Sequence, residues 1–180
     1  SSVPSIVIGL FFLLLSIYLH EEFLTNFLPS LFLSSLALAL LVMPYIVKNT
    51  QYALDSIPKH IKLLSLKLGL SKTKNLFLVL IPYCSKELLS GIFLALGRAC
   101  EDTAVIMLTG AVASVGIASS IFSKYEALPF YIYYISTNYA DETELNQAFS
   151  AALILLIISL VLFLLTKLIQ KGVKRKDGYY

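Results

Sequence analysis

Long apolar stretches are the feature that most constrains what this chain can fold into. A helix that crosses the hydrocarbon layer of a membrane needs about 20 mainly apolar residues. Four stretches meet or nearly meet that length, at about residues 3–19, 27–47, 88–113 and 148–169. Charged residues make up only 14% of the chain, against about 25% in an ordinary soluble domain. The sequence therefore predicts an all-α integral membrane protein, a polytopic helical bundle with about four spans.

The segments between these stretches alternate in charge. Residues 48–75 hold six lysines and a single acid, and the C-terminal tail is also basic. Residues 114–147 hold four acids and one lysine. Because basic loops stay in the cytoplasm, we expect residues 48–75 and the C-terminus to face inward. The chain starts without Met or a basic region before its first apolar stretch, so we expect no signal peptide and missing earlier spans.

The basic loop carries the signals of a helical hairpin. Ser56 could cap a first helix, which apolar residues at helical spacing extend through Leu68. Gly69 suits the position just past a helix end. Ser71 could cap a second helix that stops near Pro82. The alternative, equally open on periodicity alone, is an amphipathic loop lying on lipid headgroups.

Three charges interrupt the third apolar stretch. Arg98, Glu101 and Asp102 lie near the middle of a helix predicted over residues 88–113, where charges are costly and usually face protein or water. Spacings of three and four residues allow Arg98 to pair with either acid on one helix face. One interpretation is a static ion pair that fixes helix packing. The other is a polar lining for an anion, because the guanidinium group can donate two hydrogen bonds to phosphate oxygens.

Several functions find no support in the sequence. No phosphate-cradling nucleotide motif is present, so ATP would be handled by another chain. The cysteines show no metal-site or disulfide spacing, His20 and His60 fall on opposite sides of the predicted membrane, and nothing indicates nucleic-acid binding. Adjacent Glu101 and Asp102 diverge by about 100° on a helix, which is poor geometry for a catalytic pair. We expect no enzyme, no catalytic residue, no metal site and no cofactor.

A spaced pattern in the basic loop resembles a known signature. Its members are Leu63, Leu64, Ser65, Gly69, Val79, Ile81 and Pro82. The pattern is similar to the coupling loop of ABC importer permeases: Glu-Ala-Ala, three residues, Gly, nine residues, Ile, one residue, Leu-Pro. The first triplet departs from it, with leucine where Glu is usual. The resemblance implies that residues 48–82 form a coupling loop that docks on a separate ATP-binding cassette subunit.

The charged stretch resembles the phosphate permeases of that class. Residues 95–104 are similar to the pattern Ala-Leu-(Gly/Ala)-Arg-Ala-x-Gly-Glu-Thr-Ala. Arg98 and Thr103 match it, Asp102 replaces the Glu, and Glu101 replaces the Gly. Residues 3–11 resemble the Pro-Ser-Ile-Val-x-Gly-Leu-Phe run of the same permeases, and later motifs favour the A-type (PstA-like) subunit. The resemblance implies that Arg98, Glu101, Asp102 and Thr103 line the path of the substrate.

That likeness covers nearly the whole chain and implies a permease domain over residues 1–180, the last four of six spans. It implies ATP-driven import of inorganic phosphate by alternating access across a bacterial or archaeal cytoplasmic (inner) membrane. The implied partners are a second, PstC-like permease subunit, ATP-binding cassette subunits, an extracytoplasmic phosphate-binding protein and membrane lipid. Another oxyanion, such as molybdate or tungstate, and a purely structural membrane subunit remain as alternatives.

Overall fold

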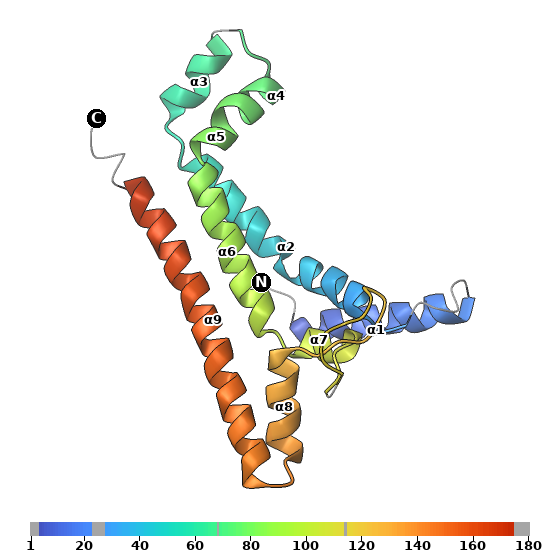
Figure 1. Cartoon of the computed structure of the whole chain (residues 1–180). Coiled ribbons are helices and arrows are strands. Elements are labelled where there is room, and N and C mark those ends of the chain that lie inside the picture. Colours follow the sequence, from blue (N-terminus) through green and yellow to red (C-terminus); the bar gives the residue numbers. More distant parts are fainter. Residues whose placement is uncertain (1–3, 23–27, 68, 114, 175–180) are drawn as a thin grey trace. The chain divides into compact units, whose positions relative to one another are not determined.

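The structure, a computed structural model, describes residues 4–22, 28–67, 69–113 and 115–174. Nearly all regular structure in these ranges is helical, and the only β-type pairing there is one parallel bridge between Ala111 and Tyr125. The elements are α1 (Ser5–Glu22), α2 (Leu31–Asp55), α3 (Lys59–Lys67), α4 (Lys72–Asn75), the π-helical η1 (Leu76–Leu80), α5 (Ile81–Tyr83), α6 (Ser85–Glu101), α7 (Ala104–Thr109), α8 (Leu128–Asn138) and α9 (Glu142–Lys174) (Figure 1). The predicted all-α class is confirmed.

Two of the described helices are long and apolar enough to cross a membrane, α2 and the Glu142–Gln170 part of α9. A third span is possible if Lys72–Tyr83 and Ser85–Glu101, which meet at a 72° bend, are counted as one broken span. Helix α1 is apolar but shorter. The structure thus has two or three candidate spans by length and composition, where the sequence predicted about four.

The predicted continuous span over residues 88–113 is wrong. Helix α6 ends at Glu101, two residues are not helical, and the short helix α7 follows. The physical reason is a competing hydrogen bond, because the Asp102 carboxylate accepts the Val105 backbone N–H at 2.9 Å. Short acidic side chains that bond to nearby backbone in this way favour helix ends over helix interiors.

The described chain divides into two compact units, each considered by itself. The first comprises Ser1–Met43 and Gly97–Leu160. Its core is built where α1 packs on α7 and on the first part of α2, around Ile8, Phe12, Leu33, Ala37, Leu41 and Val105. Gly9 permits this close packing, since a Cβ there would lie 3.2 Å from the Ala104 carbonyl oxygen and 2.9 Å from a Leu108 methyl group.

The start of α2 is held by segments far away in the chain. The first backbone N–H groups of a helix have no partner inside the helix. Here Ser30 N donates to Thr109 O at 2.9 Å, Leu31 N to Ser123 O at 3.0 Å and Phe32 N to Ile121 O at 2.8 Å. The end of α7 and the loop after it therefore supply the carbonyl groups that hold the start of α2.

The second unit comprises Pro44–Leu96 and Val161–Tyr180. It contains the end of α2, the elements α3 to α5 with η1, most of α6 and the end of α9. Ala53, Ile57 and Cys84 form its buried cluster, and Leu54, Ile61, Leu80 and Leu88 pack against them. This cluster joins the two arms of the predicted hairpin to both neighbouring long helices.

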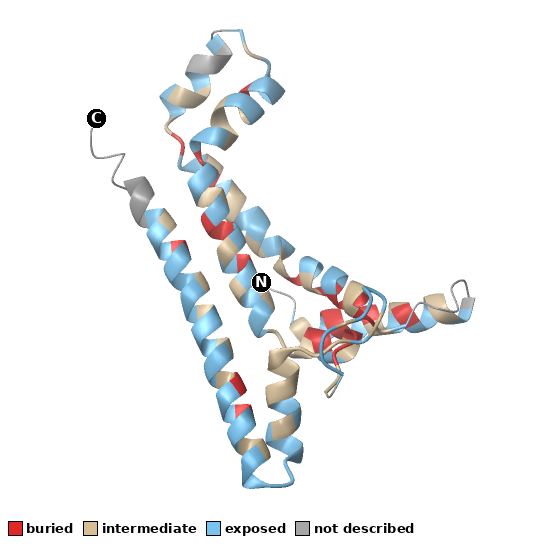
Figure 2. Ribbon diagram, viewed as in Figure 1, coloured by how far each residue is buried: buried red, intermediate tan, exposed pale blue. Residues whose placement is uncertain are grey.

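Large apolar side chains cover much of the outer surface of the long helices. Figure 2 shows that most of α9 is exposed, and its exposed residues include Leu153, Ile157, Leu164 and Leu168. Helix α1 likewise exposes Phe11 and Leu14. Contiguous apolar surface of this extent is unfavourable in water and is typical of contact with lipid or with partner subunits.

Lowering the pH is expected to loosen the first turn of α9. The Asp141 carboxylate accepts hydrogen bonds from the Thr143 hydroxyl and from Glu144 N, which lower its pKa. A depressed folded-state pKa means that this stabilisation is complete above the pKa of the unfolded chain and is lost as pH falls through the folded value. Amide hydrogen exchange at Glu144, corrected for the intrinsic rate, should lose protection in that window. Protection that is unchanged at acid pH would contradict the capping role.

Candidate functional site

The charged residues of the candidate substrate path lie where α6 ends. Arg98 is in the last turn of α6 and Glu101 is its last residue, and both are exposed. A cation in the last turn of a helix interacts favourably with the partial negative charge of the C-terminal carbonyl groups. The helix end therefore favours a cation such as Arg98 at this position.

Asp102 and Thr103 lie in the non-helical step between α6 and α7 and are both half-buried. Through its bond to Val105 N, the Asp102 carboxylate satisfies one of the first N–H groups of α7, as capping side chains do. Because α6 ends at Glu101, Asp102 lies one residue past the helix end, and its pairing with Arg98 stays a prediction. The four predicted residues are adjacent along the chain, but Asp102 has a backbone partner of its own.

A cluster of hydroxyl groups near this step has no signal in the sequence. Thr109, fully buried, donates its hydroxyl to Val105 O at 2.7 Å, and its Oγ1 lies 2.9 Å from Ser34 Oγ. Tyr125, in the loop after α7, also bonds to Ser34, and burial raises the pKa of its phenol. These residues come from separate parts of the chain, so only the fold brings them together.

The predicted hairpin is present in the second unit. Its first helix is α3, and Gly69 follows with a positive φ of 86°, a conformation that glycine adopts without strain. Ser71 caps α4 by accepting Lys74 N at 3.4 Å. Ser56 does not cap as expected, because α3 begins only at Lys59, and the Ser56 hydroxyl donates to Ala53 O at the end of α2. Leu68 lies outside the described residues.

The second arm of the hairpin ends at Tyr83, one residue after Pro82, and the predicted stop near Pro82 is confirmed. Proline lacks an N–H and crowds the carbonyl group four residues before it. The preceding segment η1 is π-helical, with Ile81 N donating to Leu76 O, and this wider turn lets the chain pass Pro82. The helical direction then changes by 72° at Cys84 before α6 begins.

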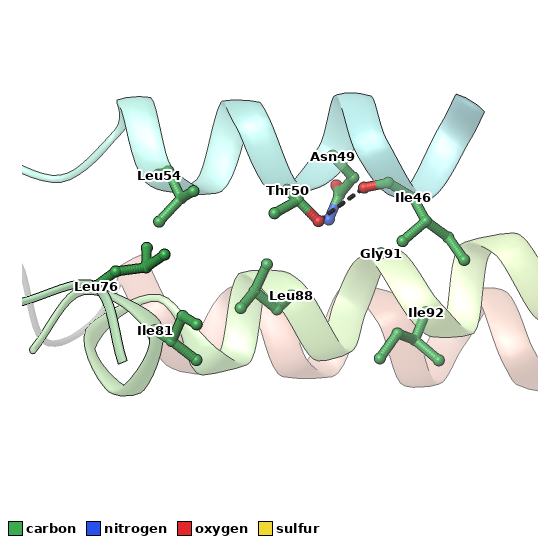
Figure 3. Close-up of a pocket in the computed structure, with 9 residues that line it drawn as sticks. All are labelled: Ile46, Asn49, Thr50, Leu54, Leu76, Ile81, Leu88, Gly91 and Ile92. Carbon is green, nitrogen blue, oxygen red and sulfur yellow. Dashed lines mark hydrogen bonds between the residues drawn. The ribbon is translucent and has the colours of Figure 1, made fainter. Parts of the chain in front are cut away.

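The two arms are tied together by one buried amide. Asn75 is 4% exposed, and its Nδ2 donates to Lys62 O at 3.2 Å. At the base of the hairpin, a cavity of about 320 Å³ separates the end of α2 from the second arm and from α6 (Figure 3). Asn49 reaches across from α2 to donate to Glu87 O at 3.1 Å. The hairpin is thus bonded internally and packed on both long helices.

The tip and the outer face of the hairpin are exposed. Leu63, Phe77 and Leu78 are 52%, 61% and 67% exposed. Of the other residues in the predicted signature, Gly69 and Pro82 are exposed, while Val79 and Ile81 are half-buried. The side chains of Leu64 and Ser65 lie outside what the structure describes. Exposed apolar side chains among lysines suit an interface with another molecule.

Replacing Asn75 with alanine should loosen the hairpin. The change removes the Asn75–Lys62 bond between the arms, which should lower the local stability by about 1–3 kcal/mol. Hydrogen exchange in α3 should accelerate accordingly. Thr73→Ala is the matched control, because Thr73 is exposed on the same arm. Equal exchange rates in both variants would show that Asn75 does not join the arms.

No group of three or more His, Cys, Asp or Glu side chains is placed to hold a metal ion among the residues that the structure describes. His20 belongs to the first unit and His60 to the second. The arrangement therefore offers two features for function: a charged helix break and an exposed helical hairpin.

Comparison with known proteins identifies the family. Residues 1–175 match the model of the family described as "Binding-protein-dependent transport system inner membrane component". The chain is 32% identical over 163 residues to the "Phosphate transport system permease protein PstA" of Xylella fastidiosa, covering 91% of this chain and 54% of that protein. It is 37% identical over 109 residues to the "Probable ABC transporter permease protein YqgI" of Bacillus subtilis, covering 61% of this chain and 35% of that protein.

A more distant relative is the "Probable phosphate transport system permease protein PstA" of Methanocaldococcus jannaschii, 29% identical over 129 residues, which cover 72% of this chain and 46% of that protein. The chain spans about half the length of the phosphate permeases it matches, between 46% and 54% for these two. No solved structure matches it. The resemblance to phosphate permeases is confirmed, and the chain belongs to the family of binding-protein-dependent transport system inner membrane components.

Proposed function

We propose that this chain is part of the pore-forming permease subunit of an ATP-driven phosphate importer. The observation that carries the proposal is the charged helix break, where an exposed arginine lies in the last turn of α6, four residues before Asp102. The relatives named as phosphate permeases support the choice of phosphate. Discontinuous helices in transporters commonly border the route of the substrate, because their ends leave polar groups within the membrane.

Arg98 is the residue proposed to meet the anion. An arginine exposed on the surface of a membrane subunit is too costly to leave facing lipid. In the assembled importer its side chain would border a polar route or the second permease subunit. Glu101, exposed on the same helix end, would limit the affinity for anions and so favour release. Asp102 and Thr103 would form the non-helical step between α6 and α7. Asp102 would stabilise it by accepting a hydrogen bond from a backbone N–H of α7.

The hairpin within residues 48–82 is proposed to be the coupling loop that docks on an ATP-binding cassette subunit. Leu63, Phe77 and Leu78 would supply apolar contacts, an arrangement like that of helices that bind in grooves. The buried cluster around Ile57 and Cys84 would pass movement of the hairpin to α2 and α6, since packed elements move together as rigid bodies. Such movement would drive alternating access.

The proposed assembly includes a second, PstC-like permease subunit, ATP-binding cassette subunits and an extracytoplasmic phosphate-binding protein. Membrane lipid would surround the permease subunits. The basic segment 48–75 and the C-terminus would face the cytoplasm, following the distribution of lysines. The name of the family, with its reference to a binding protein and to the inner membrane, supports this arrangement. ATP hydrolysis would take place on the partner chains.

Uptake of labelled phosphate into vesicles tests the function. The complete importer, with its binding protein outside and ATP inside, should accumulate phosphate, and vesicles that contain a non-hydrolysable ATP analogue should not. Unlabelled molybdate and tungstate serve as competitors. Transport of one of these in place of phosphate would overturn the substrate, and ATP-independent uptake would overturn the mechanism. If the assembled complex moves no oxyanion, a structural role for the chain gains support.

A further inference from the structure

The second unit contains another cavity, of about 260 Å³, whose lining residues, unlike those of the first cavity, mostly carry a polar group. It lies where the end of α2, the start of α6 and the end of α9 meet. Its lining residues are Asn49, Tyr52, Ala53, Ser56, Glu87, Ser90 and Gln170. The proposed transport function gives no role to the polar groups of this cavity.

Three polar side chains of the lining donate hydrogen bonds to protein oxygens. The Gln170 amide nitrogen donates to Ser90 Oγ at 2.8 Å, and the Asn49 amide nitrogen donates to Glu87 O at 3.1 Å. Both amide nitrogens are thus engaged with protein oxygens. The Ser56 hydroxyl donates to Ala53 O at 2.7 Å, which leaves its oxygen lone pairs as acceptors. The cavity therefore offers hydroxyl oxygens, amide oxygens and a carboxylate.

One carboxylate oxygen in this lining has no partner. Glu87 Oε2 is buried and makes no hydrogen bond to any of the residues that the structure describes. No Lys, Arg or His is among the lining residues that the structure describes, so a carboxylate here would be a partly buried charge without a described counter-charge. Such a charge is strongly unfavourable, and a buried polar group without a partner in a folded protein commonly indicates a bound water or ion.

We propose that this cavity binds one monovalent cation, with Glu87 as its counter-charge and the oxygens of Ser56, Ser90 and Asn49 as further ligands. Oxygen-only ligation suits hard cations. A single carboxylate balances one positive charge, whereas sites for divalent ions commonly bring several carboxylates together. The cation has two possible sources with this chemistry: a free alkali ion or the primary ammonium group of a phospholipid. A cation here links α2, α6 and α9 at the base of the hairpin.

Hydrogen exchange of the complete importer in lipid nanodiscs tests the site. In phosphatidylcholine with N-methyl-D-glucamine as the only cation, peptides from the first turns of α6 and the end of α9 should exchange fast. Adding Na⁺ or K⁺ at equal ionic strength should slow exchange saturably, by about 10-fold at an ion concentration ten times the Kd. If ethanolamine lipid produces the same protection without alkali ions, the lipid headgroup is the source.

Two variants make the result specific. Glu87→Gln should abolish the response to cations and should exchange more slowly than wild type in cation-free buffer, because the uncompensated charge is gone. Asp55→Asn removes an exposed acid from the same unit and should keep the full response. If neither cation source protects wild type, or if Glu87→Gln responds like wild type, the proposal is wrong.

A third variant tests a source of charge within the chain. Lys174 lies four residues after Gln170 on α9, one helical turn further toward the C-terminus. If wild type shows no response to cations and Lys174→Gln acquires one, lysine supplies the charge and the site for an external cation is overturned. The test does not depend on which oxyanion the importer carries, so the site can fail while phosphate transport stands.

Discussion

Replacing Arg98 with alanine is expected to lower ATP-driven phosphate uptake by the assembled importer about 10- to 100-fold. Each charge-assisted hydrogen bond between the guanidinium group and phosphate is worth about 1.5–3 kcal/mol, and a loss of 1.4 kcal/mol corresponds to a factor of about 10. Arg98→Lys keeps the charge but loses the planar fork, so uptake should fall by a smaller factor. Initial uptake rates over a range of phosphate concentrations measure both effects.

Lys86→Ala is the matched control for Arg98→Ala. Lys86 is an exposed cation on the same helix, at the opposite end from Arg98, and its loss should leave uptake close to that of wild type. Assembly is checked for every variant by co-purification of the partner subunits. Normal transport by an assembled Arg98→Ala importer would make Arg98 a packing residue and would remove it from the substrate path.

Gly110→Ala is expected to prevent stable folding of the first unit. Gly110 has a φ of 147°, and a Cβ added there would lie 2.5 Å from Ser30 N and 2.8 Å from Ser30 Cα. The neighbours are backbone atoms, which cannot rotate away as a side chain could. Backbone strain of about 1–3 kcal/mol adds to overpacking of about 1–3 kcal/mol. The yield of folded protein and its thermal unfolding midpoint in detergent should both fall sharply.

Gly116→Ala separates the cost of backbone strain from the cost of steric contact with neighbouring atoms. Gly116 also has a positive φ, 70°, but nothing lies within 4 Å of the position of an added Cβ. This variant should therefore lose only about 1–2 kcal/mol, the cost of a left-handed conformation for alanine. If both variants lose the same stability, the contact between Gly110 and Ser30 contributes nothing beyond the backbone conformation.

The hairpin could be predicted in detail because its signals are local. Gly69 permits a positive φ and Ser71 accepts a backbone N–H three residues on, and both effects depend only on neighbouring residues. The stop predicted near Pro82 is also confirmed, since the second arm ends at Tyr83. The π-helical geometry of η1 just before Pro82 and the packing of Leu80 against the core cluster were not predicted, because they depend on the tertiary structure.

The predicted third span shows that the length of an apolar stretch does not by itself predict one continuous helix. Residues 88–113 are apolar enough to suggest a single helix, but the Asp102 side chain caps α7 and the helix breaks. Once α7 is separate, it can pack on α1 over Gly9. The residues of the candidate path could be predicted from their charge and motif. The sequence did not predict that some of them lie at the end of α6 and that Asp102 caps α7.

By itself the sequence determined the helical membrane class, the charged stretch and the hairpin, since these follow from composition, charge and short-range hydrogen bonding. Only the tertiary structure decided where α6 breaks, how the end of α7 and the loop after it hold the start of α2, and which polar groups surround Glu87. Ser30 and Thr109, or Ser90 and Gln170, are about 80 residues apart in the chain. No local rule relates residues so far apart, because their contacts depend on how whole helices pack.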